Sequence, residues 1–252
     1  MRVLLLGASG RTGRWLLDEL AARGHEVAVV VRSPAGSRIP ADLEIHHGDV
    51  RDLAVLATAL ASVREGRPLD AVVSALGPRP GATTLHRDLA VRLVAMMPTA
   101  GIRRFIGISG AGVDVVGDQK SLRDRAVSAL AQRFGGAVVR DKQQEYEVWS
   151  ASDLDWTLVR PPRLTEDRPD PHDAGQRIGV PLGAEHRRVD DEVEHHAHRS
   201  PRRTSISRVA VARFVVDELE RPRYVRAAPL VAARRPARHR RDRLTRSASS
   251  PG

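Results

Sequence analysis

The chain contains no cysteine, which excludes disulfides and thiolate chemistry. It also has no apolar run approaching the ~20 residues that a membrane-spanning helix needs. The apolar run at residues 1–6 ends at Gly7 and is too short for a signal peptide. From these absences we expect a cytoplasmic protein that has no membrane partner.

Lysine occurs only at positions 120 and 142, although the chain carries a net charge of +10. Ten arginines and one acid fall in residues 221–252, so the rest of the chain has a net charge of only +1. A domain that recognises nucleic acid carries its basic face on the folded body. We therefore predict no specific nucleic-acid partner, and any binding through this tail would weaken steeply with salt.

Short β-rich runs alternate with helical patterns over the first two-thirds of the chain, which is typical of a parallel α/β sheet. The fold class predicted is a Rossmann-type doubly wound parallel sheet with helices on both faces. We expect strands at residues 2–6, 26–31, 43–46, 70–74, 104–109 and 155–159. We expect helices at residues 12–23, 52–63, 85–100, 120–133, 141–151 and 206–220.

The character of the sequence changes after residue 165. Residues 166–203 are rich in Asp, His, Arg and Pro, and only residues 177–182 have the pattern of a strand. We predict a single domain over residues 1–231, in which 166–203 is a poorly ordered insert in place of a substrate lobe, and a disordered arginine-rich tail over 232–252. One further hypothesis is that residues 166–203 and 233–252 are read in a shifted frame, which resequencing the locus would test.

Five histidines lie in the divergent stretch, at positions 172, 186, 195, 196 and 198. The cluster of His195, His196 and His198 matches no established metal-site spacing, and it lacks an apolar frame that would hold outer partners. We therefore predict no metal site.

A glycine-rich loop, G-x-x-G-x-x-G, links the first expected strand to the first expected helix. In a dinucleotide-binding loop, Gly7 allows the tight turn, Gly10 lets the backbone approach the pyrophosphate, and Gly13 lets helix and strand pack closely. The helix N-terminus then offers free N–H groups to the phosphates. The alternative is a tight turn without a ligand. Further donors in the loop are Ser9, Arg11 and Thr12.

The residue at the end of the second expected strand distinguishes NADP-binding proteins from NAD-binding proteins. NAD-binding proteins tend to place an acid there, whereas this chain has Arg32, which can pair with a 2′-phosphate. The predicted cofactor is therefore NADP (NADPH) rather than NAD, although Arg32 could also be an ordinary solvated charge. Positions expected to contact the adenine and ribose are Asp49, Val50, Ala75 and Gly77, each of which is equally compatible with ordinary turn chemistry.

These motifs together resemble the atypical short-chain dehydrogenase/reductases, and most of all the NAD(P)H-binding proteins related to biliverdin-IXβ/flavin reductase and to NmrA-like regulators. The resemblance also rests on the blocks at residues 105–112 and 155–165. It implies that the nicotinamide lies near the ends of strands 104–109 and 155–159. It further implies that Ser109 is the catalytic serine and that Arg160 and Pro161 lie beside the ring. The alternative for Ser109 is a hydroxyl that caps a turn.

The Tyr-x-x-x-Lys pair of the classical family is missing. In that pair the lysine lowers the pKa of the tyrosine, which then protonates the substrate. Here Ser150 stands four residues after Tyr146, and Lys142 lies one turn before Tyr146, in reversed order. Lys142 is predicted to reach the cofactor ribose or carboxamide region, or else to be a solvated helix lysine.

Three functions remain open at this point. The first is NADPH-dependent hydride transfer to a small planar acceptor such as a flavin, a quinone or a linear tetrapyrrole, which takes its proton from water. The second is a non-catalytic regulator that senses NADP(H). The third, sugar-nucleotide epimerase chemistry, normally needs the Tyr/Lys pair. The expected partner is a small-molecule substrate, and the sequence is compatible with a monomer or a homodimer.

Overall fold

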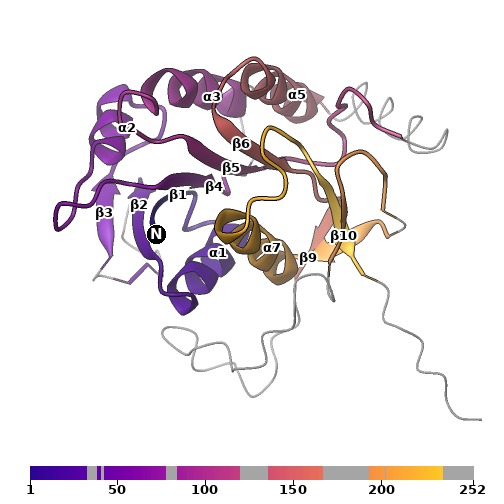
Figure 1. The fold of residues 1–252 in the computed structure, drawn as a ribbon, viewed down its shortest axis with the longest axis horizontal. Coiled ribbons are helices and arrows are strands. Elements are labelled where there is room, and N and C mark those ends of the chain that lie inside the picture. Colours follow the sequence, from indigo (N-terminus) through magenta and orange to yellow (C-terminus); the bar gives the residue numbers. More distant parts are fainter. Residues whose placement is uncertain are drawn as a thin grey trace, which may run out of the picture.

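Six parallel strands form the central sheet, in the order β3-β2-β1-β4-β5-β6 (Figure 1). The computed structural model describes residues 1–32, 39–40, 43–77, 84–119, 136–166, 193–201 and 203–234. The strand order reverses between β1 and β4, and open α/β sheets bind ligands in the crevice beside such a point. The predicted fold class is confirmed. The strands are β1 (Arg2–Leu6), β2 (Glu26–Val31), β3 (Glu44–His47), β4 (Ala71–Ser74), β5 (Arg104–Ile108) and β6 (Asp155–Val159).

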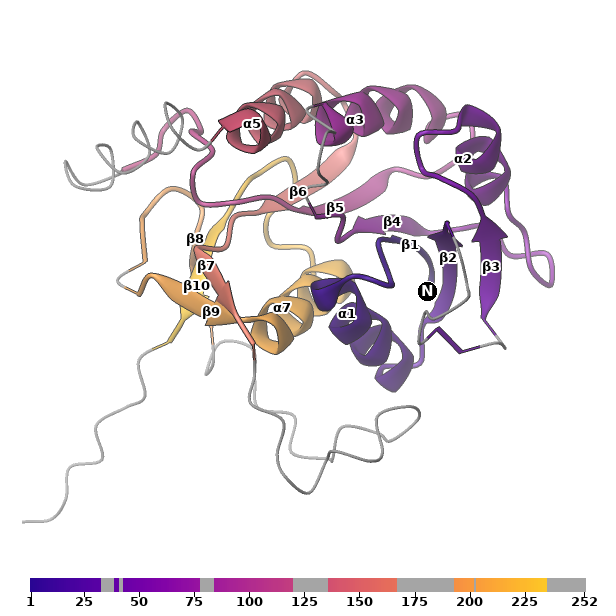
Figure 2. The same cartoon turned by 180° about the vertical axis from the view of Figure 1, so that it is seen from behind.

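Helices cover both faces of this sheet, and Figures 1 and 2 show the two layers from opposite sides. Helices α2 (Leu53–Leu60), α3 (Leu85–Met96) and α5 (Gly136–Ser150) cover one face. Helices α1 (Arg11–Ala22) and α7 (Arg208–Glu220) cover the other, where they pack against each other. Each layer buries its own apolar cluster against the strands.

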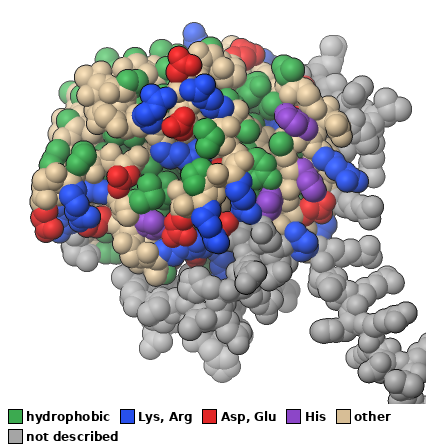
Figure 3. Space-filling view, in the orientation of Figure 1, with side chains coloured by type: hydrophobic (Ala, Val, Ile, Leu, Met, Phe, Trp, Pro, Cys, Tyr) green, Lys and Arg blue, Asp and Glu red, His purple; other side chains and the backbone are tan. Residues whose placement is uncertain are grey.

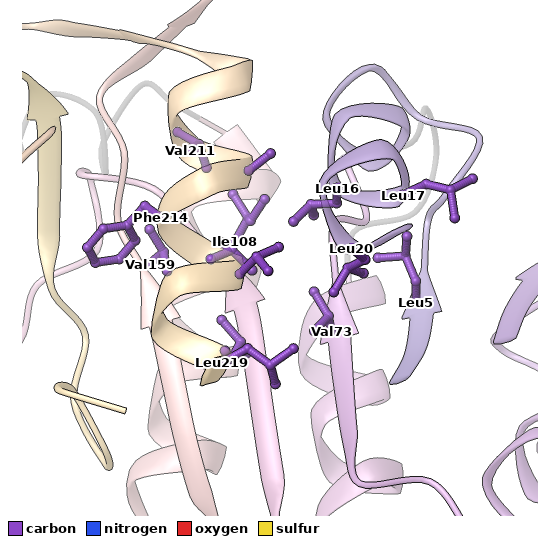
Figure 4. Packing of buried hydrophobic residues seen from close by; sticks show 14 of the residues in the cluster. Leu5, Leu16, Leu17, Leu20, Val73, Ile108, Val159, Val211, Phe214 and Leu219 are labelled. Atoms are coloured by element: carbon purple, nitrogen blue, oxygen red, sulfur yellow. The ribbon is translucent and has the colours of Figure 1, made fainter. Parts of the chain in front are cut away.

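Successive side chains of each strand point to alternate faces of the sheet, which explains why there are two apolar clusters. Leu5 belongs to the cluster under α1 and α7, whereas its neighbours Leu4 and Leu6 belong to the cluster under α2, α3 and α5. Successive strand side chains point to opposite faces, so an unbroken apolar run is what a strand covered on both faces requires. Figure 4 shows how Leu16 and Leu20 of α1 and Leu219 of α7 meet the strands in the first cluster.

Two short sheets extend the fold beyond β6. Strand β7 (Arg163–Thr165) pairs in parallel with β9 (Ser205–Ser207), and β8 (Val193–His196) pairs antiparallel with β10 (Leu230–Ala233). Within the segment expected to be poorly ordered, residues 193–196 form β8, and Val193 is fully buried. Ala232, expected at the start of a disordered tail, is buried inside β10.

Helix α7 begins two residues later than expected. Residues 205–207 form β9, and the hydroxyl of Ser207 then accepts a hydrogen bond from the backbone N–H of Ala210, which caps the helix. The helix expected at 120–133, the strand expected at 177–182, and His172 and His186 lie outside the described residues.

The surface mixes charges of both signs. On the face shown in Figure 3, acidic, basic and apolar side chains are interspersed over the described residues. Across the described ranges, no helix combines the length and the apolar character that crossing a bilayer requires.

Candidate functional site

The glycine loop packs tightly against the turn after β4. Gly7 has φ +83°, and a Cβ on it would lie 3.0 Å from the carbonyl carbon of Ala75. A Cβ on Gly13 would lie 1.9 Å from the carbonyl oxygen of Gly7, so only glycine lets α1 approach β1 this closely. The N–H of Gly10 closes the turn by donating to the Gly7 carbonyl at 2.9 Å.

The N-terminus of α1 is open toward a ligand. Gly10 is its N-cap and provides no side-chain cap, and the first turn carries no acid. The first N–H groups of a helix have no partner within it, and the helix dipole favours an anion there. A Cβ on Gly10 would lie 3.1 Å from the Gly7 oxygen, so a side chain at this position would crowd the backbone of the loop. The loop therefore fits the pyrophosphate of a dinucleotide.

The remaining loop donors take different positions. Ser9 is exposed, and Thr12 is buried at the start of α1. Arg11 is largely exposed, and its guanidinium lies 3.4 Å from Glu166, which also pairs with Arg208 of α7 at 3.0 Å. A surface pair such as Arg11–Glu166 is weak, so Arg11 can exchange this partner for a phosphate.

A second cluster of charges lies at the ends of β2 and β3. Arg51 binds both carboxylate oxygens of Asp49, at 3.1 Å from Nε and 3.0 Å from Nη2. These hydrogen bonds, together with the nearby charge of Arg32, hold the pKa of Asp49 below its ordinary value. The structure thus brings Arg32 near Asp49 and adds Arg51, which the sequence reasoning missed. The Val50 side chain, by contrast, packs in the core under α2 and α3.

A cavity of about 230 Å³ lies at the carboxyl ends of β4 and β5, next to the glycine loop. Five residues singled out from the sequence meet there, namely Thr12, Ala75, Gly77, Ser109 and Lys142. Apolar side chains form most of the remaining wall, from Leu76, Ile108, Val113, Val138, Val139 and Leu164. Such a cavity suits an apolar, planar ring held by a few polar groups.

Ser109 and Lys142, two of the polar residues that line the cavity, differ in their partners. The buried Ser109 hydroxyl has no hydrogen-bond partner among the described residues. The Lys142 ammonium is buried and donates to the Ile108 carbonyl and to the Glu145 carboxylate, both at 2.9 Å. Ser109 is therefore available to a ligand, whereas Lys142 places a fixed positive charge at the cavity wall.

Comparison with known proteins gives the family. Residues 7–222 match the model of an NAD(P)H-binding family. The chain belongs to this NAD(P)H-binding family. The match includes the glycine loop, β5 with Ser109, and α5 with Lys142, so the described cavity lies wholly within it.

Two sequences and one solved structure illustrate what the chain is similar to. The uncharacterized protein YwnB of Bacillus subtilis is 28% identical over 224 residues, which are 89% of this chain and 94% of YwnB. The chloroplastic divinyl chlorophyllide a 8-vinyl-reductase of Zea mays is 38% identical over 168 residues, or 58% of this chain and 38% of the plant protein. A short-chain dehydrogenase/reductase of Veillonella parvula in complex with NADP has the same fold, with a TM-score of 0.66, 19% identity, and coverage of 92% of this chain and 94% of that chain.

Arg160, which was expected to lie beside the nicotinamide, uses its donors within the protein. It is fully buried, and all five of its N–H donors are used within the protein. They bind the carboxylate of Asp118 and the carbonyls of Val113, Ala197 and Ala228. Arg160 therefore holds the segments around the cavity together and has no donor left for a cofactor. Pro161 is buried as well, and its carbonyl accepts from the N–H of Ala111.

Tyr146 and the histidines lie elsewhere. The Tyr146 ring packs edge-on against Trp156, 6.0 Å between centroids, and does not line the cavity. His195 bonds to the Tyr224 hydroxyl at 2.7 Å, and His196 lies 3.4 Å from Glu194. Within the described residues, no three His, Asp or Glu side chains come together as metal ligands.

Proposed function

We propose that this chain binds NADPH and transfers its hydride to a small planar acceptor, such as a flavin or a quinone. The observation that carries the proposal is the shared cavity. Thr12, from the first turn after the glycine loop, lines it together with Ser109 and Lys142. A dinucleotide whose phosphates sit on α1 can therefore extend its other end into a largely apolar chamber, where an acceptor can stack beside it.

The preference for NADPH over NADH is argued from charge. Arg32 and Arg51 flank Asp49, whose own charge is already compensated by Arg51. The cluster therefore keeps a net positive charge at the strand ends, where a 2′-phosphate would bind. Arginine is well suited to this role because its planar fork matches phosphate oxygens. The Veillonella parvula structure of the same fold is a complex with NADP, which supports this preference.

The side chains that line the cavity have simple roles in the proposed reaction. NADPH supplies the hydride when bound, and the apolar wall excludes water from the reacting faces. The unpartnered Ser109 hydroxyl can donate to an acceptor carbonyl as negative charge develops on it, and the Lys142 ammonium nearby favours that charge. Lys142 itself stays in place through Ile108 and Glu145.

A second candidate function is a regulator that binds NADP(H) without turnover. It is favoured by the tethered Lys142 and by the cavity wall, which contains no tyrosine among the described residues. Epimerase chemistry needs a tyrosine beside the lysine, and Tyr146 lies away from the cavity. We therefore do not propose that activity.

The first experiment is a fluorescence titration with NADPH and NADH on the wild type and on Arg32→Ala. Arg32→Ala removes a charge-assisted contact with the 2′-phosphate. We therefore expect it to weaken NADPH binding about tenfold or more and to leave NADH binding unchanged. Arg103→Ala is the matched control, because it removes an exposed arginine just before β5, at the opposite end of the sheet. Equal losses for both nucleotides would contradict the assignment of Arg32.

Turnover is tested on the same samples. NADPH oxidation is followed with a flavin and with a quinone present. Binding together with oxidation supports the reductase, whereas binding without oxidation of either acceptor favours the regulator. A folded wild type that binds neither nucleotide would refute both.

A further inference from the structure

A buried histidine connects three segments around the cavity. His86 is 3% exposed and lies in the first turn of α3. Its Nδ1 lies 2.8 Å from the Asp141 carboxylate of α5, and its Nε2 lies 3.1 Å from the carbonyl oxygen of Leu76, in the turn after β4. The ring thus bridges α5 to the turn that forms one wall of the cavity.

Asp141 is held as a carboxylate by several donors. Besides the His86 ring, it accepts from the backbone N–H of His86 at 3.0 Å and from that of Arg87 at 2.9 Å. Burial by itself raises the pKa of Asp141, but these hydrogen bonds outweigh burial and leave its pKa below the ordinary value. Asp141 therefore also caps the N-terminus of α3 from α5.

Both nitrogens of the His86 ring face oxygens that can only accept. A carboxylate and a backbone carbonyl have no proton to give, so each nitrogen must donate if both contacts are hydrogen bonds. The two contacts tie the ring to α5 on one side and to the turn after β4 on the other.

The tether joins two segments that line the cavity. Leu76 and its neighbours Ala75 and Gly77 belong to one segment, and Lys142, the residue after Asp141, belongs to the other. We propose that His86 is a positioning residue that fixes the spacing of these two segments and so sets the affinity for the nucleotide. The proposal rests on the proposed function, because it assumes that NADPH occupies this cavity.

Two substitutions separate the two hydrogen bonds of the ring. The side-chain amide nitrogen of glutamine reaches about as far as Nε2, whereas that of asparagine reaches about as far as Nδ1. His86→Gln therefore keeps a donor for Leu76, and residue 86 stays tied to Asp141 through its backbone N–H, which donates at 3.0 Å. His86→Asn keeps a side-chain donor for Asp141 but none for Leu76, so it alone breaks the link between α5 and the turn. We expect His86→Asn to raise the Kd for NADPH about five- to tenfold, and His86→Gln to stay within about twofold of the wild type.

A merely structural role for His86 makes a different prediction. Each variant loses one buried hydrogen bond, so affinity would then follow the free energy of unfolding, which is measured alongside by urea titration. Thr157→Val is the matched control, because it removes a fully buried hydroxyl that donates to the Tyr224 carbonyl, away from the cavity. The control is expected to lose stability without a change in Kd. Equal Kd values for the asparagine and glutamine variants would overturn the proposal.

A measurement on the wild type covers the case in which His86→Asn does not fold. The Nε2 proton of His86 is followed by NMR, and saturation with NADPH is expected to slow its exchange with water, because the occupied cavity holds the Leu76 turn in place. An unchanged exchange rate in protein that has bound NADPH would overturn the positioning role. A wild type that binds no nucleotide would instead refute the proposed function, so the two failures are distinguishable.

Discussion

Replacement of Gly13 by alanine tests the geometry of the glycine loop most directly. The new Cβ would lie 1.9 Å from the Gly7 oxygen and 2.7 Å from the Gly7 carbonyl carbon. Both neighbours are backbone atoms, so no side-chain rotation can relieve the contact. To restore even 3.0 Å, the helix and the strand must separate by about 1.1 Å.

The cost of that separation follows from the packing on both sides. Helix α1 contributes Leu16 and Leu20, both fully buried, to a close-packed cluster, so moving the helix opens gaps around them. Overpacking costs about 1–3 kcal/mol, and a contact with rigid backbone belongs at the upper end. At about 3 kcal/mol, a chain of this size would lose roughly 6–12 °C in Tm. NADPH binding should weaken as well, because the first N–H groups of α1 move with the helix.

The assay is urea and thermal unfolding of Gly13→Ala beside Gly77→Ala. Gly77 is the matched control, because a Cβ there meets no atom within 4 Å and its φ is not in the left-handed region. Its unfolding free energy should stay within about 1 kcal/mol of the wild type. If Gly13→Ala is as stable as the wild type, the close approach of α1 to β1 is wrong.

Two further predictions concern carboxylates outside the cavity. Glu218 is fully buried and pairs with Arg104 at 3.1 Å, so Glu218→Ala leaves a buried guanidinium without its counter-charge and should cost about 3–5 kcal/mol in urea unfolding. Burial raises the pKa of Glu44, but hydrogen bonds led by those from Ser62 and Arg2 outweigh it and leave the pKa below its ordinary value. The stability that Glu44 contributes is therefore present above pH ~4.3 and is lost as the pH falls through its folded-state pKa, so Glu44→Gln should flatten a plot of Tm against pH between 6 and 3.

Exposed glutamates supply the controls for these two predictions. Glu147→Ala removes a carboxylate from the outer face of α5 and should change the unfolding free energy by less than about 0.5 kcal/mol. Glu65→Gln, in an exposed turn, should leave the acid limb of the Tm curve as in the wild type. A Glu218→Ala variant as stable as Glu147→Ala, or an acid limb unaffected by Glu44→Gln, would contradict the corresponding argument.

The central strands could be predicted from the sequence because their cause is local. β1, β2 and β6 begin and end at the predicted residues, since an unbroken apolar run bounded by glycine, proline or charge leaves little choice. β8 was missed for the opposite reason. Its sequence is Val-Glu-His-His, and only its antiparallel partner β10, more than thirty residues later, makes it a strand.

The residues of the candidate site also fall into those that the local sequence predicts and those that depend on distant partners. The glycine loop is predictable because its spacing and its place between strand and helix are both visible in the sequence. Arg160 looked like a cofactor contact because it follows a strand that ends near the site, and its partner Asp118 is forty-two residues away. Arg51 and His86 gave no signal, because each acquires meaning only from the residue that the fold places beside it.

The proton needed for reduction limits which acceptors fit the proposed function. A carbonyl reduced to an alcohol requires a proton donor at the carbonyl oxygen, which the classical family supplies as tyrosine. Here Tyr146 packs against Trp156, and the Lys142 ammonium is tied to Ile108 and Glu145, which leaves hydroxyls such as that of Ser109 as the side-chain donors of the cavity wall. Serine is a poor acid, although it can donate a hydrogen bond. An acceptor such as a flavin or a quinone delocalises the charge that arrives with the hydride and can take its proton later from water, so it places the least demand on this cavity.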